Sequence, residues 1–243
     1  MHGPPAESMK RTLTAHEVHV WTVALDSVPP SMESRGECLS ADERTRATLF
    51  TAPLEQRRYI ASRIVLRHLL ASYLGVSAAE VLIRREPGGR PFIEGADRLF
   101  FNLSHSRDTA LIAVADVMVG VDVERARRIA RAGSIARRIL HPDTVAALRS
   151  LPRGERERAF LYAWTQREAH VKAVGGGLFR TPDVLPFDPR QPDDASVRSI
   201  PARHDGSLWS VAHFRPHAAA LAAVVTRGEL RQIRLVEWQD DTH

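Results

Sequence analysis

Residues 98–124 read RLFFNLSHSRDTALIAVADVMVGVDVE, and this stretch decides which fold class the sequence predicts. It divides into three short runs of apolar and β-branched residues: RLFFNLS (98–104), TALIAVAD (109–116) and MVGVDVE (118–124). Runs of this length and composition are typical of β-strands, and links of only a few residues favour antiparallel neighbours. We therefore predict three strands here, each lying next to the one before it.

Before this stretch the sequence predicts one more strand and two helices. VHVWTVALD (18–26) is rich in residues that favour strands. Ser40 and Glu43 in LSADERTRATLF have the spacing of a capping box, which predicts the start of a helix. A longer helix is predicted over 53–74, because a proline opens the segment, a glycine follows it, and its apolar residues can form one buried stripe.

After this stretch the pattern of helices and strands is repeated. Residues 125–174 are rich in Ala, Arg, Leu and Glu and predict mainly helix. Further strands are predicted near 196–200, 208–214, 218–226 and 231–238. The predicted order of strands and helices is that of an α+β fold, and it occurs twice along the chain. We divide the chain into a disordered tail (1–14), an N-terminal α+β half (15–119) and a C-terminal α+β half (120–243).

Composition narrows the class of protein without deciding its function. The chain has 243 residues, 44% of them hydrophobic, and its 34 Lys and Arg exceed its 29 Asp and Glu. This basic excess indicates an anionic partner, such as a phosphorylated small molecule, an acidic protein or a nucleic acid. Cys38 is the only cysteine, which excludes an intramolecular disulfide and a Cys-based zinc site. Neither a signal peptide nor an apolar run long enough to cross a membrane is recognisable, so we expect a cytoplasmic protein without a membrane partner.

Two acidic side chains of GVDVE (120–124) form the first candidate site. Asp122 and Glu124 are two residues apart on a predicted strand, so both side chains project from the same face. A divalent cation between them would relieve their repulsion, and magnesium prefers carboxylates that are completed by substrate phosphates. The alternative is a strand that runs out into solvent with two exposed acids.

Two further segments carry groups suited to phosphate. FNLSHS ends a predicted strand with Asn102, Ser104 and His105, compact groups that can hold a phosphate or a hydroxyl. GGRPF combines glycines, which allow a ligand to approach the backbone closely, with the guanidinium of Arg90. The alternatives are an ordinary turn for the first segment and an ordinary hairpin for the second.

The segment WTQREAHVKAVGGGL (164–178) supplies a carboxylate and an ammonium on one helix face. Glu168 and Lys172 are four residues apart, and three glycines follow. Taken alone, this pair reads as a salt bridge on a surface helix with a glycine cap. The histidines form neither a His-x-His nor an HExxH pattern, so we reject a zinc hydrolase.

Taken in order, GGRPF, FNLSHS, GVDVE and FLYAWTQREAHVKAVGGGL resemble the signature blocks of 4'-phosphopantetheinyl transferases of the surfactin-synthetase-associated (Sfp) type. The most specific marks of that family are a G-[VI]-D-x-E strand and a later helix that reads roughly W-[ST]-x-K-E-[AS]-x-x-K. The matching residues are Gly120, Asp122 and Glu124 in the first mark and Trp164, Thr165, Glu168, Ala169 and Lys172 in the second. The similarity covers more than half of the chain.

The resemblance implies an enzyme that moves phosphopantetheine from coenzyme A to a serine of an acyl- or peptidyl-carrier protein and releases 3',5'-ADP. It implies Mg²⁺, or Mn²⁺ in its place, bound by Asp122, Glu124 and Glu168. Such a metal would neutralise the pyrophosphate during an in-line displacement. The expected catalytic residues are Asp122, Glu168, which would help to deprotonate the serine, and Lys172, which would stabilise phosphate charge. The pathway stays open between fatty-acid, polyketide and nonribosomal-peptide synthesis.

The resemblance also assigns residues to coenzyme A. The expected contacts are Arg44, Arg58, Arg90, Ser104, His105, Arg167 and Lys172. Arg167 departs from the family pattern, which usually has lysine there. Arginine keeps the charge but does not release its proton at physiological pH, so phosphate binding at 167 survives the change and proton transfer does not.

The expected architecture and partner follow from the same resemblance. The family fold is a pseudo-dimer of two similar α+β halves with the active site in the cleft between them. This implies a monomer with internal pseudo-twofold symmetry. The family's carrier proteins are acidic, and the basic excess of this chain suits such a partner.

Two other functions are compatible with parts of the sequence. A basic chain can bind nucleic acid, but here the arginines are spread through segments that also carry acids, such as ERARRIARAG and RGERERAF, and no nucleic-acid-binding motif is recognisable. The other alternative is a relative that binds coenzyme A or a carrier protein without turnover. The intact catalytic and metal-binding set argues against it.

Overall fold

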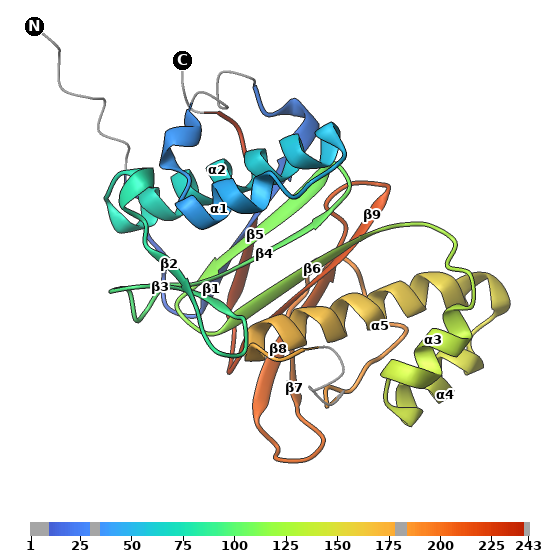
Figure 1. Ribbon diagram of the computed structural model, residues 1–243. Helices are drawn as coiled ribbons and strands as arrows, with labels where there is room; N and C mark the ends of the chain where they lie inside the picture. The colour runs from blue at the N-terminus through green and yellow to red at the C-terminus, as the bar shows by residue number, and fades with distance from the viewer. Residues whose placement is uncertain (1–9, 30–34, 178–183, 241–243) are drawn as a thin grey trace, which may run out of the picture.

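The computed structural model describes residues 10–29, 35–177 and 184–240. The first nine residues of the expected disordered tail therefore lie outside the described residues. The fold is α+β, as predicted. Two four-stranded sheets are stacked, and a 22-residue helix covers the outer face of each (Figure 1).

The first sheet has the strand order β10-β1-β5-β4, the second has the order β6-β9-β8-β7, and β2 and β3 form a separate hairpin. The strands are β1 (Glu17–Ala24), β2 (Ile83–Arg85), β3 (Pro91–Ile93), β4 (Phe100–Ser106), β5 (Thr109–Ala115), β6 (Val119–Arg125), β7 (Arg198–Pro201), β8 (Leu208–Phe214), β9 (Ala220–Arg227) and β10 (Gln232–Glu237). The α-helices are α1 (Ala41–Ala47), α2 (Pro53–Leu74), α3 (Ala132–Ile139), α4 (Pro142–Ser150) and α5 (Arg153–Val174). Within the described ranges, no helix combines the length and the apolar character needed to cross a bilayer.

Local signals in the first half predict the helix boundaries correctly. α2 begins at Pro53 and ends at Leu74, and Gly75 follows in the left-handed conformation. Both hydrogen bonds of the capping box form at the start of α1. The Glu43 amide donates to Ser40 Oγ (3.2 Å), and the Ser40 amide donates to Glu43 Oε2 (2.9 Å). Two amides that would otherwise lack partners are thereby satisfied.

The predicted pairing of the three strands in 98–124 is correct for one pair and wrong for the other. β4 and β5 are antiparallel neighbours, with Phe101 opposite Val114. β5 and β6 are not paired, because β1 and β4 already occupy the two edges of β5. The chain crosses instead to the second sheet, where β6 pairs with β9. The short link after β5 therefore joins two sheets.

β10 is predicted in the C-terminal half of the chain but belongs to the first sheet. β10 lies parallel to β1, with Gln232 opposite Glu17, and it completes the first sheet. The C-terminal half (120–243) therefore contributes one strand to the sheet of the N-terminal half.

Three apolar layers hold the helices and sheets together. Between α2 and the first sheet, Ile64 packs in one cluster with Ile112 of β5. Between the two sheets, Ala113 of β5 packs in a second cluster with Val121 of β6. Between the second sheet and α5, Ala169 packs with residues of β8 and β9. The result is a sequence of four layers: helix, sheet, sheet and helix (Figure 1).

Side chains of β4 join the two sheets along one edge of β6. The amide of Val121 donates to Asn102 Oδ1 (3.1 Å), and the amide of Val123 donates to Ser104 Oγ (3.4 Å). A third bond of this kind, from the next alternate residue of β6, is made to Ser106 Oγ (3.3 Å). Alternate polar residues of FNLSHS thus satisfy an edge that would otherwise have unpaired amides.

Candidate active site

β6 and α5 approach each other closely at Gly120. A Cβ atom at this position would lie 1.9 Å from the carbonyl oxygen of Ala169, so only glycine fits without a shift. Val121 packs between the sheets, and its neighbours Gly120 and Asp122 therefore face the helix. The close approach places the Asp122 side chain beside the turn of α5 that carries Lys172.

Asp122 and Lys172 form an ion pair at this contact. Lys172 Nζ lies 2.6 Å from Asp122 Oδ1, 2.9 Å from Ser104 Oγ and 3.3 Å from the carbonyl oxygen of Val121. Ser104 donates its hydroxyl to the same Asp122 oxygen (2.9 Å). Asp122 is only 5% exposed. Burial raises the pKa of its carboxyl, and the neighbouring ammonium and hydroxyl offset only part of that effect.

Glu124 on β6 and Glu168 on α5 are half-buried and lie within the electrostatic reach of Asp122. The pKa of each glutamate is raised, first by desolvation and then by the negative charge of Asp122. Trp164 of α5 makes a hydrogen bond to the Glu124 carboxylate, which links the two sequence motifs directly. The structure thus places both predicted glutamate ligands within electrostatic range of Asp122.

One oxygen of Asp122 offers an acceptor that a divalent cation would satisfy. Asp122 Oδ2 is buried without a hydrogen-bond partner among the described residues, and such an acceptor is costly unless a donor or a cation reaches it. A cation would also relieve the repulsion among the three carboxylates. In the part of the chain that the structure describes, no three acidic, His or Cys side chains are gathered tightly enough to hold a metal as they stand. Asp122 Oδ1 is directed toward Lys172 instead.

A basic cleft of about 250 Å³ lies next to the ion pair. Its charged lining consists of Arg63, Arg85, Arg90 and Lys172. Glycines from the β2–β3 turn and from the end of α5 line another part of it, and these two segments touch. A Cβ atom on Gly88 would lie 2.1 Å from the carbonyl oxygen of Gly175. Convergent cations beside exposed backbone suit a ligand that carries phosphate.

Two of the arginines in the cleft are held in place by carboxylates. Arg90 makes a bidentate pair with Glu86, with Nη2 2.6 Å from Oε1 and Nε 3.0 Å from Oε2. Arg63 Nε donates to Glu43 Oε1 (2.7 Å). The sequence predicts Arg90 but neither Arg63 nor Arg85. A usable signal for Arg85 is its position close to GGRPF, whereas no local pattern marks Arg63.

Ser104 and His105, both predicted to contact coenzyme A, lie on either side of β4. Ser104 is buried and bonds to Asp122 and Lys172, so it belongs to the charged cluster. His105 is exposed. Partial desolvation, followed by the positive charge of Lys172, lowers the pKa of its imidazole. Both residues therefore lie near Lys172, one inside the protein and one at its surface.

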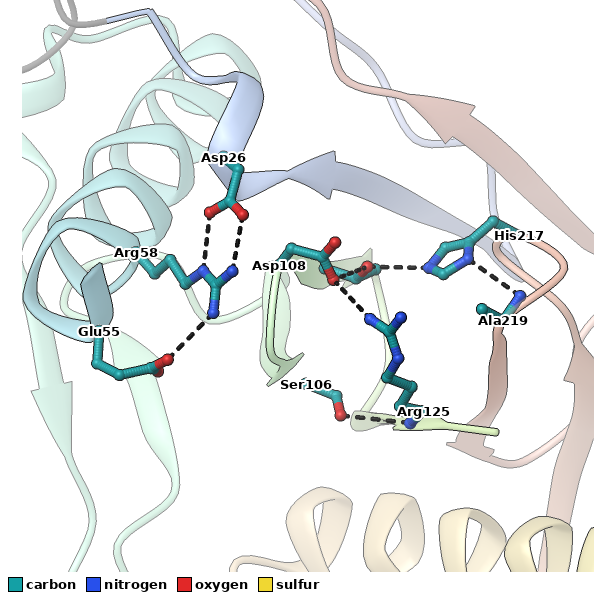
Figure 2. A network of polar contacts seen from close by, with 9 residues as sticks. Asp26, Glu55, Arg58, Ser106, Asp108, Arg125, His217 and Ala219 are labelled. Carbon is teal, nitrogen blue, oxygen red and sulfur yellow. Dashed lines mark hydrogen bonds and ion pairs between the residues drawn. The ribbon is translucent and has the colours of Figure 1, made fainter. Parts of the chain in front are cut away.

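The other three predicted arginines are outside the lining of this cleft among the described residues. Arg58 is bound by two carboxylates: Nε and Nη2 donate to Asp26 (2.8 and 2.7 Å), and Nη1 donates to Glu55 (3.0 Å) (Figure 2). Arg44 is exposed on α1 and donates to a main-chain carbonyl just before its helix. Arg167 is buried, at 6% exposure, one position back on α5 from Glu168.

Figure 2 also shows how the strand that carries GVDVE is fixed where it ends. The amide of Arg125 donates to Ser106 Oγ (3.3 Å), and Arg125 Nη1 lies 3.6 Å from Asp108 Oδ1 in the turn between β4 and β5. At the start of β5, Thr109 Oγ1 lies 3.0 Å from His217 Nε2. The two contacts of Arg125 tie the end of β6 to the first sheet, so the position of Glu124 depends on both sheets.

The fold and the site together define an α+β protein that sets a carboxylate cluster beside a guanidinium-lined cleft, an arrangement that suits a phosphorylated ligand. Family models narrow this class. The model described as 4'-phosphopantetheinyl transferase superfamily matches residues 118–225. The model described as 4'-phosphopantetheinyl transferase, N-terminal, matches residues 26–117.

Individual relatives agree with the family models. The 4'-phosphopantetheinyl transferase HetI of Nostoc sp. is 35% identical over 224 residues, covering 89% of this chain and 90% of the relative. The 4'-phosphopantetheinyl transferase psf-1 of Bacillus pumilus is 30% identical over 140 residues, covering 58% and 59%. AcpT of Salmonella typhimurium, also named a 4'-phosphopantetheinyl transferase, is 31% identical over 162 residues, covering 65% and 79%. The chain belongs to the 4'-phosphopantetheinyl transferase superfamily, a family of transferases, as its motifs predict.

Proposed function

We propose that this protein transfers 4'-phosphopantetheine from coenzyme A to a serine of an acyl- or peptidyl-carrier protein, with Mg²⁺, and releases 3',5'-ADP. This is the reaction of a holo-[acyl-carrier-protein] synthase. The observation that carries the proposal is the cluster of Asp122, Glu124 and Glu168, with the unpartnered Asp122 Oδ2, beside a cleft lined by arginines. A pyrophosphate donor needs both halves of that arrangement.

The carboxylates divide into metal ligands and a base. Asp122, Glu124 and Glu168 would hold Mg²⁺, or Mn²⁺ in its place, and the metal would supply charge neutralisation at the pyrophosphate. Glu168 has a raised pKa because of desolvation and the charge of Asp122. A carboxylate whose pKa is closer to neutrality is a better general base. We assign to Glu168 the proton of the attacking serine, taken directly or through water.

The cations of the site would bind the phosphates of coenzyme A. Lys172 is closest to the carboxylates and would stabilise charge on the transferred phosphate. Arg90, with Arg63 and Arg85, would bind phosphate farther along the cleft. His105 and Ser104 would contact the 3'-phosphate end of coenzyme A, as the family resemblance implies. Arg44, Arg58 and Arg167 stay candidates that would have to change partners or surroundings to reach it.

The proposed architecture is a pseudo-dimer with the active site between its halves. In the first sheet β1, β5 and β4 are consecutive neighbours and α2 covers them; in the second, β6, β9 and β8 are consecutive neighbours and α5 covers them. Each of these pairings is antiparallel. This repeated order supports an internal pseudo-twofold axis, and we expect the enzyme to act as a monomer in the cytoplasm.

The proposed protein partner is an acidic carrier. The formal net charge of the chain is +5, and opposite net charges accelerate association and make it sensitive to salt. Candidate pathways are fatty-acid, polyketide and nonribosomal-peptide synthesis.

Intact-protein mass spectrometry of an apo carrier protein tests the proposal. The carrier is incubated with the enzyme, coenzyme A and Mg²⁺, and a phosphopantetheine-sized gain in mass is expected. The gain should disappear with EDTA and with Glu168→Gln. The matched control is Glu155→Gln, because Glu155 is an exposed glutamate on the same helix and its loss should leave the gain unchanged. No gain on fatty-acid, polyketide or peptide carriers, although the folded enzyme binds coenzyme A, would contradict transferase activity.

A further inference from the structure

Lysine is rare in this chain, and that makes Lys172 informative. Of the 34 basic residues counted as Lys and Arg, only Lys10 and Lys172 are lysines. Arginine therefore serves wherever a positive charge suffices, including three of the four cations that line the cleft. The lysine at 172 calls for a reason that is specific to its ammonium group.

The contacts of Lys172 supply that reason. Its Nζ donates to three acceptors: Asp122 Oδ1 (2.6 Å), Ser104 Oγ (2.9 Å) and the carbonyl oxygen of Val121 (3.3 Å). An ammonium is a compact point charge with three donors, and it can serve three acceptors that converge on one point. A planar guanidinium spreads its charge and its donors over a fork and cannot do so.

Lys172 thus pairs with one oxygen of the Asp122 carboxylate, the group that would also bind a divalent cation. It neutralises Asp122 through Oδ1, while Oδ2 stays buried and unpartnered among the described residues. A divalent cation close to the same carboxylate would meet the ammonium as a like charge, and a repulsion at short range is large inside a protein. The ammonium can leave Asp122 at low cost only when another anion receives it.

We propose that Lys172 is the resident cation of the metal-free site, which it leaves for a phosphate of the co-substrate when metal and co-substrate bind together. The proposal rests on the proposed function, because that function supplies both the metal and the phosphate. Its consequence is positive coupling between the two ligands: each binds more tightly when the other is present, and the coupling is reciprocal. The side chain is 27% exposed, so it is open to the cleft that would hold the phosphate.

Isothermal titration of Mn²⁺ into the protein without coenzyme A provides the test. Lys172→Met removes the ammonium and keeps an unbranched apolar stem, so it should bind Mn²⁺ about tenfold more tightly than the natural protein. Lys10→Met is the matched control, since it is the same substitution at the only other lysine, and it should bind Mn²⁺ like the natural protein. Circular dichroism and thermal unfolding establish that each variant is folded, and Lys172→Gln replaces Lys172→Met if the latter is not.

The same titrations with coenzyme A present measure the coupling. Coenzyme A should raise the Mn²⁺ affinity of the natural protein and of Lys10→Met about tenfold or more, and it should raise that of Lys172→Met by about twofold or less. Equal Mn²⁺ affinities of the natural protein and Lys172→Met without coenzyme A would overturn the role of Lys172 and leave the proposed function standing. No Mn²⁺ binding by the folded natural protein, with or without coenzyme A, would overturn both.

A spectroscopic measurement follows the ammonium itself. With two lysines in the chain, a protein labelled with ¹⁵N-lysine gives two Nζ signals, and Lys10→Met assigns them. The Lys172 signal should shift when coenzyme A and Mg²⁺ are added together and move much less with Mg²⁺ alone. Equal shifts under both conditions would contradict the exchange of partners.

Discussion

α2 and α5 lie in equivalent surroundings, but the polar contacts made from their last turns differ in chemistry. Both have 22 residues, both end at a left-handed glycine, Gly75 or Gly175, and each covers the outer face of a four-stranded sheet (Figure 1). In each case a polar side chain from the last helical turn reaches polar groups on a strand beneath it. In α2 that side chain is Tyr73, which bonds to His19 Nδ1 on β1 (2.5 Å). In α5 it is Lys172, which bonds to Asp122 on β6.

The two contacts differ in the size of the side chains around them. The face of α2 that packs on the first sheet carries Leu69 and Tyr73, whereas α5 has Ala169 and Ala173 in the corresponding last turns. The small residues, with Gly120 opposite them, bring α5 very close to β6. The contact under α2 is closed, with Tyr73 and His19 at 6% and 5% exposure, and the contact under α5 stays open at Lys172. The same arrangement of a helix on a four-stranded sheet can therefore bury a polar contact or leave it open to a cleft.

The largest effect we expect is on the open contact. Asp122→Asn removes the charge that would bind both metal and Lys172, and the rate of carrier loading should fall about a thousandfold. Tyr73→Phe removes the hydroxyl at the polar contact under α2. Buried hydrogen bonds are lost, but the rate of carrier loading should stay within about twofold of that of the natural protein. Both rates are measured by mass spectrometry of the carrier. A comparable loss of rate in both variants would break the distinction between the two contacts.

The next effect concerns the distance between α5 and β6. Gly120→Ala places a methyl group against the Ala169 carbonyl and the Ala173 amide, so the free energy of unfolding should fall by about 3 kcal/mol. Gly133→Ala is the control, because a Cβ atom there meets nothing within 4 Å and lies in helix α3. Its stability should change by less than about 1 kcal/mol. Urea unfolding measures both. Equal stabilities of the two variants would mean that the close approach is not required.

The smallest effect concerns acid sensitivity. Where α2 has Leu70, α5 has His170, which is 4% exposed and packs edge-on against Trp209. Desolvation lowers the pKa of His170 from 6.5 to about 4. Below pH 6.5 the unfolded chain therefore binds a proton that the folded protein does not, and stability should fall as the pH drops toward 4.

His170→Leu copies the residue of α2 and should remove part of this dependence. The loss of stability between pH 6.5 and 4 should shrink by on the order of 2 kcal/mol, measured by urea unfolding at each pH. His213, which is buried and whose pKa is lowered to about 3, should supply acid sensitivity that persists in the variant. An unchanged pH profile in His170→Leu would show that this residue does not contribute.

The elements of the fold could be predicted because their signals are local. The proline at 53 and the glycine at 75 bound α2, and the capping box at Ser40 starts α1. The pairing of β6 with β9 and of β10 with β1 could not be predicted in the same way. Strand partners far apart in the chain are chosen by packing of the whole molecule, which no short pattern contains.

In the candidate site, too, the residues in local motifs could be predicted and those placed by tertiary contacts could not. Asp122, Glu124, Glu168 and Lys172 lie in two recognisable motifs, so their meeting is expected from the sequence. The pairing of Arg58 with Asp26 and the entry of Arg63 into the cleft depend on tertiary contacts. Asn102 is predicted among the groups suited to phosphate; it lines the basic cleft, and its Oδ1 also accepts a hydrogen bond from the Val121 amide of β6. Only the folded chain shows that these strand-end side chains join the two sheets.

The parallel pairing of β10 with β1 matters during protein synthesis. A ribosome releases β1 long before β10, and domains generally form as their parts emerge. Until the last strand arrives, one edge of β1 has no partner, and an exposed edge of this kind invites pairing with other chains. A chain that ends before residue 232 would therefore lack β10, the edge strand of the first sheet beside β1. Nascent chains of this protein should need protection from aggregation until β10 has emerged.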